Sequence, residues 1–395
     1  MSTITLAKRI ARVQPSATLA VAARAAELKA AGKDIISLST GEPDFDTPES
    51  IKQAAITAMQ AGHTKYTAVD GIAELKQAII HKFQRDNQLT YAANQILVSS
   101  GAKHSLYNLM QALLDAGDEV IIPAPYWVSY PDMVKLADAT PVTVTSTIAQ
   151  DFKITPQQLA QAITPRTKLF ILNSPSNPTG KIYSRAELAA LADVLLQHPQ
   201  VITVTDDIYE NIMWTQEPFS NLAMVCPELY DRIIVVNGVS KLYAMTGWRI
   251  GYAAGAANVI AGMKKMQSQS TSCPTSIAQY AAAAAIGGDQ SLTQPMIEAF
   301  HQRHDYVYQR LSALTTINVT PADGTFYIFP DCQSLIAQKG LADDVALAEA
   351  LLNECGIAVV PGTAFGSPNC IRLSFATSMT LLQTALDRLS EFATS

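Results

Sequence analysis

Short, uniformly apolar runs alternate along most of the chain with segments of helical periodicity. A strand with one solvated face alternates apolar and polar residues, whereas these runs are apolar throughout, as in a sheet covered by helices on both sides. The alternation of strands and helices therefore predicts an α/β fold with a mostly parallel sheet. The predicted strands are residues 95–100, 119–125, 168–175, 201–207, 232–238 and 249–255.

Three of the intervening helices carry local signals at their ends. A helix that begins near residue 102 is predicted to end at Gly117. Thr155 followed by Pro156 is typical of an N-cap and a first helical residue, and Ser184 with Glu187 three positions later forms a capping box. These signals predict helices directly after residues 155 and 184.

The pattern changes beyond about residue 290. A long helix-like segment is followed by short strand-like runs and a second helix, which predicts a smaller α+β domain joined by the N-terminal segment. We therefore expect a large domain at 45–290 and a small domain made of 1–44 and 291–395. The predicted elements of the small domain are helices at 292–315 and 341–355 and strands at 317–321, 324–330, 356–362 and 370–376.

Composition and charge narrow the functional classes. The 395 residues are 48% hydrophobic, enough for one large or two moderate cores. Lys+Arg number 28 and Asp+Glu 34, scattered without a basic stripe, so nucleic acid is not an expected partner. The five cysteines are far apart, so we expect reduced thiols and no metal site.

The sequence shows neither a secretory signal nor a membrane-spanning run, and we therefore expect a cytoplasmic protein. The first 20 residues carry Lys8, Arg9 and Arg12 without an uninterrupted apolar core, unlike a secretory signal. The alanine-rich run at 280–288 is too short to span a bilayer, so no membrane association is expected.

Polar residues with distinctive chemistry follow two of the predicted strands in the first half of the chain. After 95–100, Gly101 and Ala102 open a helix whose N-terminal amides are suited to phosphate, although any strand–helix turn needs a small residue. After 168–175 comes Asn177, and the Asn177–Pro178 bond is a candidate cis peptide that would fix the Asn amide. Taken alone, a plain turn explains Asn177 as well.

Two later strands end in a similar way. Asp206 follows an apolar strand, where a carboxylate needs a positive group or a donor, although it could simply cap a helix. After 232–238 come Ser240, Lys241 and Arg249; Ser and Arg could bind a phosphate, while a lone loop lysine is usually a solvated charge. In a doubly wound sheet these strand ends meet at one edge, where ligands bind.

Together these residues suit one kind of ligand. Pyridoxal 5′-phosphate needs an amine for its aldehyde, an anion for its ring nitrogen, donors for its phenolate oxygen and a cup for its phosphate. The four strand ends offer all of these groups. The sequence therefore predicts a pyridoxal-phosphate site.

The motifs that carry these residues resemble those of class I aminotransferases of fold type I, a resemblance that extends over nearly the whole chain. Within that family the chain is most similar to the bacterial-type aspartate aminotransferases, subgroup Iβ. Two family positions differ, because Ser176 stands where Asn is usual and Asp207 where Glu is usual. The motifs are "PSAT" (15–18), "GEPDFDTP" (41–48), "PYWVSY" (125–130), "NSPSNPTG" (173–180), "DDIYE" (206–210), "GVSKLYAMTGWRIG" (238–251), "SQST" (268–271) and "IRLSFA" (371–376).

The resemblance implies a role for each residue around the cofactor ring. Lys241 would bond to the cofactor and later move the substrate proton. Asp206 would pair with the ring nitrogen, Asn177 and Tyr209 would donate to the phenolate oxygen, and Trp127 would stack on the ring. For the two aromatic residues, ordinary core packing is the alternative.

The resemblance also implies the phosphate cup. It would consist of the turn at Gly101 with the amides of Ala102 and Lys103, together with Ser240 and Arg249. Tyr66 would reach the phosphate from a second subunit, which implies a homodimer with shared active sites.

The resemblance further implies how the substrate is held. Arg372 would clamp the α-carboxylate in a bidentate pair, assisted by Asn177 and Trp127, and Gly41 would let the backbone approach. Lys103 would bind the second carboxylate, assisted by Ser16 and Thr18. The alternatives are a surface position for Arg372 and a solvent-directed first-turn side chain for Lys103.

The predicted function is therefore transamination between L-aspartate and 2-oxoglutarate by a ping-pong mechanism, and the resemblance leaves amination of prephenate open as a further activity. The alternatives on the same scaffold are an aromatic-amino-acid or alanine aminotransferase, or a lyase. A pyridoxal-phosphate-binding transcription regulator is disfavoured, because the family pattern begins by residue 15 and leaves no space for a winged-helix module before it.

Overall fold

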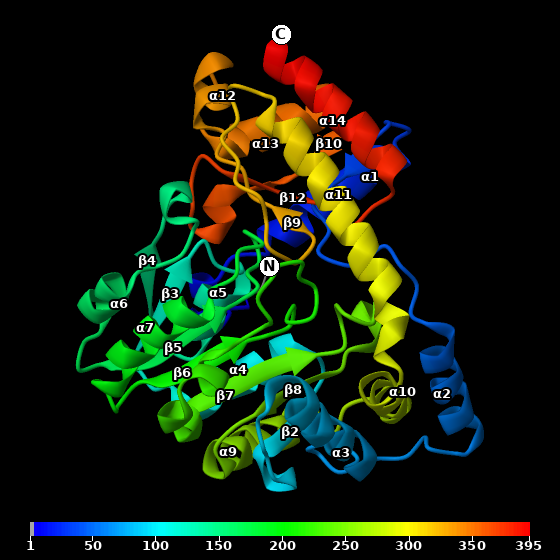
Figure 1. Cartoon of the computed structure of the whole chain (residues 1–395), viewed down its shortest axis with the longest axis vertical. Coiled ribbons are helices and arrows are strands. Elements are labelled where there is room, and N and C mark those ends of the chain that lie inside the picture. The colour runs from blue at the N-terminus through cyan, green and yellow to red at the C-terminus, as the bar shows by residue number, and fades with distance from the viewer. Residues whose placement is uncertain (1–3) are drawn as a thin grey trace.

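The computed structural model describes residues 4–395, which fold into three sheets and their covering helices (Figure 1). The strands are β1 (Ile36–Ser37), β2 (Ile96–Ser99), β3 (Glu119–Ala124), β4 (Thr140–Thr145), β5 (Thr167–Asn173), β6 (Ile202–Asp206), β7 (Ile233–Gly238), β8 (Gly251–Ala254), β9 (Tyr327–Ile328), β10 (Ile357–Ala358), β11 (Val360–Pro361) and β12 (Ile371–Ser374). The α-helices are α1 (Ala17–Ala30), α2 (Glu49–Gln60), α3 (Ala73–Lys82), α4 (Ala102–Leu113), α5 (Ser129–Leu136), α6 (Pro156–Ala162), α7 (Arg185–Leu196), α8 (Leu222–Val225), α9 (Ala257–Ser268), α10 (Ser276–Gly287), α11 (Gln294–Ser312), α12 (Gln333–Gln338), α13 (Asp344–Glu354) and α14 (Met379–Thr394).

The largest sheet has seven strands in the order β2-β8-β7-β6-β5-β3-β4. Strand β8 is antiparallel to both of its neighbours, and the remaining pairs are parallel. The predicted α/β class with a mostly parallel sheet is confirmed. Because β5, β6 and β7 are parallel neighbours, Asn173 lies opposite Asp206, and the residues after each strand meet at one edge.

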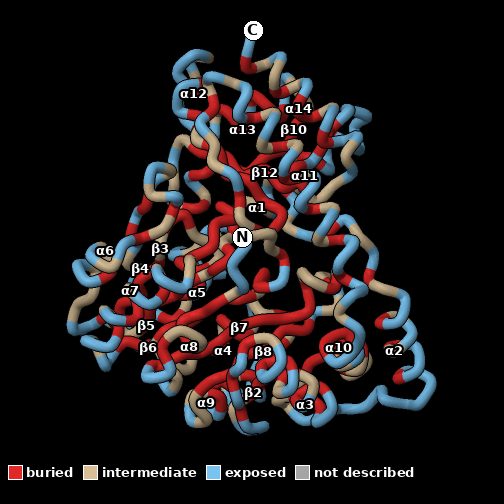
Figure 2. Tube along the Cα trace, viewed as in Figure 1, coloured by how far each residue is buried: buried red, intermediate tan, exposed pale blue. Residues whose placement is uncertain are grey.

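The central strands are buried on both faces, as their uniformly apolar sequences predict (Figure 2). In β7, Ile233 and Val235 belong to a core shared with α3, α7 and α10. The alternate residues Ile234 and Val236 belong to a second core shared with α4, α5 and α9. Successive side chains of a strand point to opposite faces, so an all-apolar strand supplies both cores at once.

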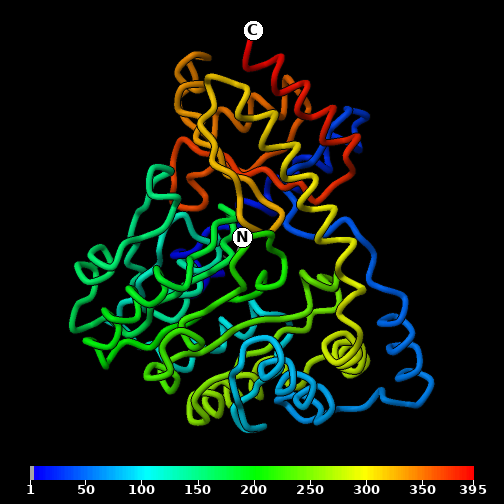
Figure 3. The backbone as a smooth tube through the Cα atoms, in the orientation of Figure 1, coloured from blue at the N-terminus to red at the C-terminus, as the bar shows by residue number. Residues whose placement is uncertain are grey.

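The C-terminal third builds two smaller sheets. Strands β11, β12 and β9 are antiparallel, and β1 pairs in parallel with β10, so that Ile36 lies opposite Ile357. This pairing places N-terminal chain among the C-terminal elements, where the blue and orange traces run together in Figure 3. Helices α11, α13 and α14 pack on these strands around a separate apolar core.

Several boundaries differ from the predictions. Strand β4 was not predicted, because it is an edge strand with exposed threonines and a proline. Helix α4 ends at Leu113 rather than at Gly117, since its last turn gives way to an extended residue, Leu114. Residues 317–321 form no strand and contribute only a single bridge, from Asn318 to Asp331.

The predicted helix starts are confirmed. The Thr155 side chain accepts a hydrogen bond from the Gln158 amide, and Ser184 does the same for Glu187, each in a capping box. Among residues 4–395, no helix combines the length and the apolar character that a membrane crossing requires.

Candidate active site

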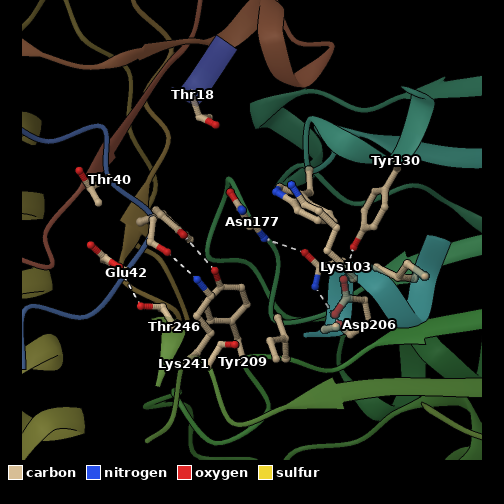
Figure 4. Close-up of a pocket in the computed structure, with 18 of the residues that line it drawn as sticks. Thr18, Thr40, Glu42, Lys103, Tyr130, Asn177, Asp206, Tyr209, Lys241 and Thr246 are labelled. Carbon is tan, nitrogen blue, oxygen red and sulfur yellow. Dashed lines mark hydrogen bonds between the residues drawn. The ribbon is translucent and has the colours of Figure 1, made fainter. Parts of the chain in front are cut away.

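A cavity of about 460 Å³ lies at the edge of the large sheet where β5, β6 and β7 end. Side chains from these strand ends, from the segment after β1 and from α1 converge on it (Figure 4). Arg372 of β12 also lines it. It is lined by the predicted site residues Thr18, Gly41, Ala102, Lys103, Trp127, Asn177, Asp206, Tyr209, Ser240, Lys241, Arg249 and Arg372.

Asp206 is held at the end of β6 with one oxygen free. Its Oδ2 accepts a hydrogen bond from the Tyr130 hydroxyl at 2.5 Å, whereas its Oδ1 is buried without a partner. Burial raises the pKa of Asp206 to about 6, against the lowering effect of Tyr130. Asp206 does not cap a helix, so the alternative interpretation is wrong, and its free oxygen is available to a cation or donor in the cavity.

Lys241 follows β7 and extends its amine toward the opposite wall of the cavity. Nζ donates a hydrogen bond to the Gly41 carbonyl and lies 5.9 Å from the centre of the Tyr209 ring. Burial, followed by the nearby Arg372 guanidinium, lowers the pKa of Lys241 from 10.5 to about 8. The residue is therefore not a solvated loop lysine, and a substantial fraction of its amine is neutral near physiological pH.

The turn that opens α4 is shaped around Arg249. Gly101 has φ 89°, and a Cβ there would lie 2.2 Å from Nη2 of Arg249. A Cβ on Gly251 would lie 2.1 Å from the Ala102 nitrogen, so both glycines allow β8 to approach the start of the helix. The first amides of a helix lack intrahelical partners, and here they face the cavity beside a guanidinium.

Ser240 and Arg249 complete this cationic corner. Ser240 is buried, and Arg249, with φ 57°, donates from Nη1 to the Thr246 carbonyl at 2.8 Å. The remaining guanidinium N–H groups and the Ser240 hydroxyl are polar donors at the same end of the cavity as the α4 amides. An anion with several oxygens suits this end.

Arg372 on β12 is fully enclosed rather than on the surface. Its Nη1 donates to Oδ1 of Asn177 at 3.0 Å and its Nη2 to the Ser39 carbonyl at 2.7 Å, while Nε has no partner. A guanidinium carries five N–H groups, so three remain for a ligand. Burial lowers the pKa of Arg372, which stays cationic because its ordinary pKa is so high.

Asn177 is oriented by its neighbours. Its backbone amide donates to Oδ1 of Asn173 at 2.8 Å, and its side-chain oxygen accepts from Arg372, which leaves the Asn177 Nδ2 as a donor. The Asn177–Pro178 bond is not cis, contrary to the candidate assignment; the cis bonds of the described chain precede Pro125 and Pro175. The network of Asn173 and Arg372, rather than a cis bond, fixes this side chain.

Lys103 supplies a second cation at the cavity. Its Nζ lies 4.9 Å from the centre of the Trp127 ring, and burial, followed by Arg249, lowers the pKa of Lys103. Lys103 therefore lines the cavity, while the residue as a whole remains exposed at the start of α4. Thr18 also lines the cavity, whereas Ser16 lies just outside it and shares a 2.9 Å hydroxyl contact with Thr18.

Of the two remaining predicted residues, Gly41 lines the cavity and Tyr66 does not. Gly41 lies against Tyr327, where a Cβ would be 2.7 Å from the tyrosine oxygen. Tyr66 is 92% exposed and does not line the cavity of its own chain.

The residues of the cavity wall that could not be predicted from the sequence include Tyr130, Tyr327, Thr246 and Glu42. Tyr130 binds Asp206, and the Tyr327 hydroxyl lies 2.9 Å from that of Tyr209. Thr246 donates to a carboxylate oxygen of Glu42 at 2.8 Å. Tyr130, Glu42 and Thr246 lie within the quoted motifs and Tyr327 lies outside them, and nothing in their spacing indicates that they face the cavity.

Comparison with known proteins finds relatives that match nearly the whole length of the chain. Residues 33–389 match the family described as "Aminotransferase class I and II". The chain is 52% identical to the aspartate/prephenate aminotransferase of Nitrosomonas europaea and 51% identical to the aspartate aminotransferase of Geobacillus stearothermophilus, each match covering 98% of both chains.

Solved structures agree. The fold resembles the crystal structure of the aspartate aminotransferase from Rhizobium meliloti, with a TM-score of 0.95, 44% identity and 99% of each chain covered. It also resembles the aspartate aminotransferase of Thermus thermophilus solved with maleate, with a TM-score of 0.93, 42% identity, and coverage of 99% of this chain and 100% of that one.

Proposed function

Because the chain belongs to the family of class I and II aminotransferases, we propose that it exchanges the amino group between L-aspartate and L-glutamate and their 2-oxo acids. The observation that carries this proposal is that two cationic side chains, Arg372 and Lys103, line the same cavity as the Lys241 amine. A dicarboxylic amino acid needs two such partners. The relatives named as aspartate aminotransferases support the same substrate.

The cofactor of this family is pyridoxal 5′-phosphate, and the cavity fits it. The buried, unpartnered Oδ1 of Asp206 suits a cationic ring nitrogen. The glycine-shaped corner at Gly101 suits a phosphate, held by the α4 amides with Ser240 and Arg249. When bound, the cofactor supplies an aldehyde for covalent attachment and a ring that withdraws electrons from the substrate.

We assign the remaining contacts as follows. Lys241 would form the covalent attachment, Trp127 would cover the ring, and Asn177 and Tyr209 would donate to the ring oxygen. The Tyr209 hydroxyl is held by its hydrogen bond with the Tyr327 hydroxyl. The Asn177 side chain is held because its Oδ1 accepts a hydrogen bond from Arg372. Each donor is thus oriented before a ligand arrives.

We assign the transfer of the substrate Cα proton to Lys241. An amine with a pKa of about 8 accepts a proton readily near neutral pH and still releases it again. Once the substrate amine has replaced that covalent attachment and the Lys241 amine is free again, Lys241 Nζ would take the proton that leaves the substrate Cα. The guanidinium of Arg372 and the amine of Lys103 would meanwhile hold the two carboxylates and so orient the Cα–H bond.

The substrate assignment is tested at Lys103. We expect Lys103→Ala to lower kcat/KM for aspartate by about 100-fold, since a charge-assisted bond of about 2–3 kcal/mol is lost, and to change kcat/KM for alanine by less than about threefold. Steady-state rates with aspartate, alanine and phenylalanine measure this. Lys265→Ala, an exposed lysine on α9, controls for the loss of one charge. An unchanged preference for aspartate would favour the aromatic or alanine alternative.

A second acceptor is supported by one comparison. The Nitrosomonas europaea relative is named for prephenate as well as aspartate. Prephenate also carries two carboxylates, so the same pair of cations could hold it. Amination of prephenate with glutamate or aspartate as donor, followed by chromatography of the product, tests this activity.

We further propose a cytoplasmic homodimer with shared active sites. Tyr66, 92% exposed, lies in the same part of the chain as the exposed apolar residues Ile56 and Met59 of α2. Burial against a second copy would cover these side chains and bring Tyr66 to the partner's phosphate cup. The five free cysteines support a reducing compartment. Sedimentation tests the homodimer, and cell fractionation tests the cytoplasmic location.

We also propose that residues 45–290 form the cofactor-binding domain and that 1–44 and 291–395 form the smaller domain. The separate apolar core under α11, α13 and α14, which includes Ile36 and Leu38, supports this division. Limited proteolysis near residues 45 and 290 tests it.

A further inference from the structure

Gln267, in the last turn of α9, is a fully buried side chain whose hydrogen-bonding groups are all used. Its Nε2 donates to the carbonyls of Val69 at 2.7 Å and Val98 at 2.8 Å. Its Oε1 accepts from Oγ of Ser99 at 2.8 Å and from Nδ2 of Asn108 at 3.0 Å. A primary amide has two donor hydrogens and two lone pairs, so this side chain is saturated.

The four partners belong to three different elements of the site. Val98 and Ser99 end β2, directly before the turn at Gly101 that opens the phosphate cup. Asn108 lies on α4, the helix whose first amides form that cup. Val69 lies in the connection between α2 and α3, three residues after Tyr66. One amide therefore holds the cup and this connection in a fixed relation.

The connection is anchored at further points along the same stretch. The Val98 amide donates to the Asp70 carbonyl at 3.1 Å. Gln279, also fully buried, donates to Oγ1 of Thr67 at 3.0 Å and accepts from the Ile72 amide at 2.8 Å. The anchored stretch ends where Tyr66 begins, and Tyr66 is 92% exposed. Tyr66 thus projects into solvent directly before a stretch that is held in place by hydrogen bonds.

We propose that Gln267 is a positioning residue that joins the phosphate cup of its own active site to the segment that delivers Tyr66 to the active site of a second subunit. This inference rests on the homodimer proposed above. A change at Gln267 would then disturb two cofactor sites: its own, through Ser99 and Asn108, and the partner's, through Val69.

The effect on its own site is tested by comparing two ligands. Gln267→Met keeps the volume and removes all four hydrogen bonds, which leaves two buried carbonyls without donors. After removal of the cofactor from the full-length protein, pyridoxal phosphate and pyridoxal are titrated separately. We expect affinity for pyridoxal phosphate to fall about tenfold and affinity for pyridoxal to change less than about twofold, because only the former uses the cup.

The matched control is Met263→Ala, one turn earlier on α9. Met263 is also fully buried but packs in the apolar core against α4. Its truncation should lower the melting temperature and preserve the ratio of the two affinities. If Gln267→Met also preserves the ratio, the inference is overturned. Should Gln267→Met fail to fold, Ser99→Ala, which removes one of the bonds, must shift the ratio in the same direction, and an unchanged ratio overturns the inference equally.

The effect on the partner's site is tested in heterodimers. One chain is wild type and the other carries Gln267→Met together with Lys241→Ala. The only site with an intact Lys241 then has a wild-type cup and receives Tyr66 from the altered chain. We expect this site to release pyridoxal phosphate about tenfold faster than the site of a heterodimer with Lys241→Ala alone.

The outcomes separate this inference from the proposed function. Both measurements follow cofactor binding, so they hold whichever amino acid the enzyme uses. Equal release rates in a confirmed heterodimer overturn the coupling alone. A protein that sediments as a monomer overturns the shared site, and this inference with it.

Discussion

At the residue scale, burial shifts two ionisable groups in opposite directions. It raises the pKa of Asp206 and lowers that of Lys241, because a low-dielectric site disfavours either charge. The charges are needed only when a ligand supplies their partners. The burial of these two groups therefore carries an electrostatic cost that ligand binding offsets, as expected of a site organised for a charged ligand.

This cost predicts a pH-dependent effect of Lys241→Met on the cofactor-free protein. With a folded pKa of about 8 against an ordinary 10.5, the unfolded chain binds more protons between these values, so stability rises with pH across this window. Lys241 therefore lowers the free energy of unfolding by its full amount below pH 8, and this penalty disappears by about pH 10.5. We expect Lys241→Met to raise the melting temperature by about 2 °C at pH 7, and the difference to close by about pH 10.5.

Melting curves between pH 7 and 10.5 measure this effect. Lys265→Met, at an exposed position on the same protein, should show no such trend. A melting-temperature difference for Lys241→Met that is constant over the whole range would contradict the shift.

Arg372 gives a second prediction at this scale. Its planar guanidinium is already committed to Asn177 and Ser39, so only its remaining N–H groups can hold a carboxylate. A lysine cannot reproduce both tasks. We expect Arg372→Lys to lower kcat/KM for aspartate about 100-fold, mainly through KM, while the affinity for pyridoxal phosphate changes less than about threefold.

Arg388→Lys, remote from the cavity beside Asp34, is the matched control for this exchange and should leave both quantities unchanged. Equal kinetics for Arg372→Lys and wild type would remove Arg372 from the substrate site.

The residues that could be predicted from the strand pattern alone, without the family resemblance, are those at the ends of apolar strands. Asp206 and Lys241 could be placed together because neighbouring parallel strands end at one edge. Tyr130 and Tyr327 could not, because they reach the cavity from a helix and from the small antiparallel sheet. Their contacts depend on how the layers pack, and local periodicity carries no such information.

At the element scale, the segment after β6 is braced from behind. Glu210 is buried and paired with Lys82 of α3, and it accepts from Nδ2 of Asn237 on β7 at 2.6 Å and from Nδ2 of Asn87 at 3.0 Å. The bracing ties the segment that carries Tyr209 to the strand that precedes Lys241. Element packing, rather than a single residue, thus sets the spacing of the site.

This brace predicts a large loss of stability in Lys82→Met. Removing one partner of a buried ion pair leaves the other charge buried alone, which costs about 3–5 kcal/mol. We expect the free energy of unfolding to fall by about 3 kcal/mol in chemical denaturation. Lys135→Met, which breaks a half-exposed pair with Asp132, should change it by less than about 1 kcal/mol. Equal effects of the two substitutions would show that the Glu210 brace contributes little.

Elements with two buried faces were predictable, and those at edges were not. Strand β7 is apolar throughout and was placed correctly, whereas β4 alternates threonine with valine at the sheet edge and resembles a loop. Residues 317–321 have strand-like composition, yet they find only one bridging partner. Composition indicates propensity, but pairing decides whether a strand forms.

At the scale of the whole molecule, Tyr66, which we assign to the phosphate, does not line the cavity of its own chain. Tyr66 is exposed while the segment behind it is anchored by Gln267 and Gln279. In the proposed homodimer, each phosphate cup is complete only when the partner is present. Cofactor binding and subunit association would therefore be linked, each strengthening the other by the same factor.

This linkage predicts that pyridoxal phosphate stabilises the dimer. Sedimentation of serially diluted cofactor-free protein should give a dissociation constant at least about tenfold higher than that of the cofactor-bound protein. Tyr66→Phe removes the hydroxyl that would contact the phosphate while keeping the ring, so it should reduce this ratio without abolishing the dimer. Tyr280→Phe, which also removes a tyrosine hydroxyl, is the control because its stacking on His63 is kept. If the cofactor leaves the dimer constant unchanged, Tyr66 does not serve the partner's site, because a shared contact must act on both equilibria.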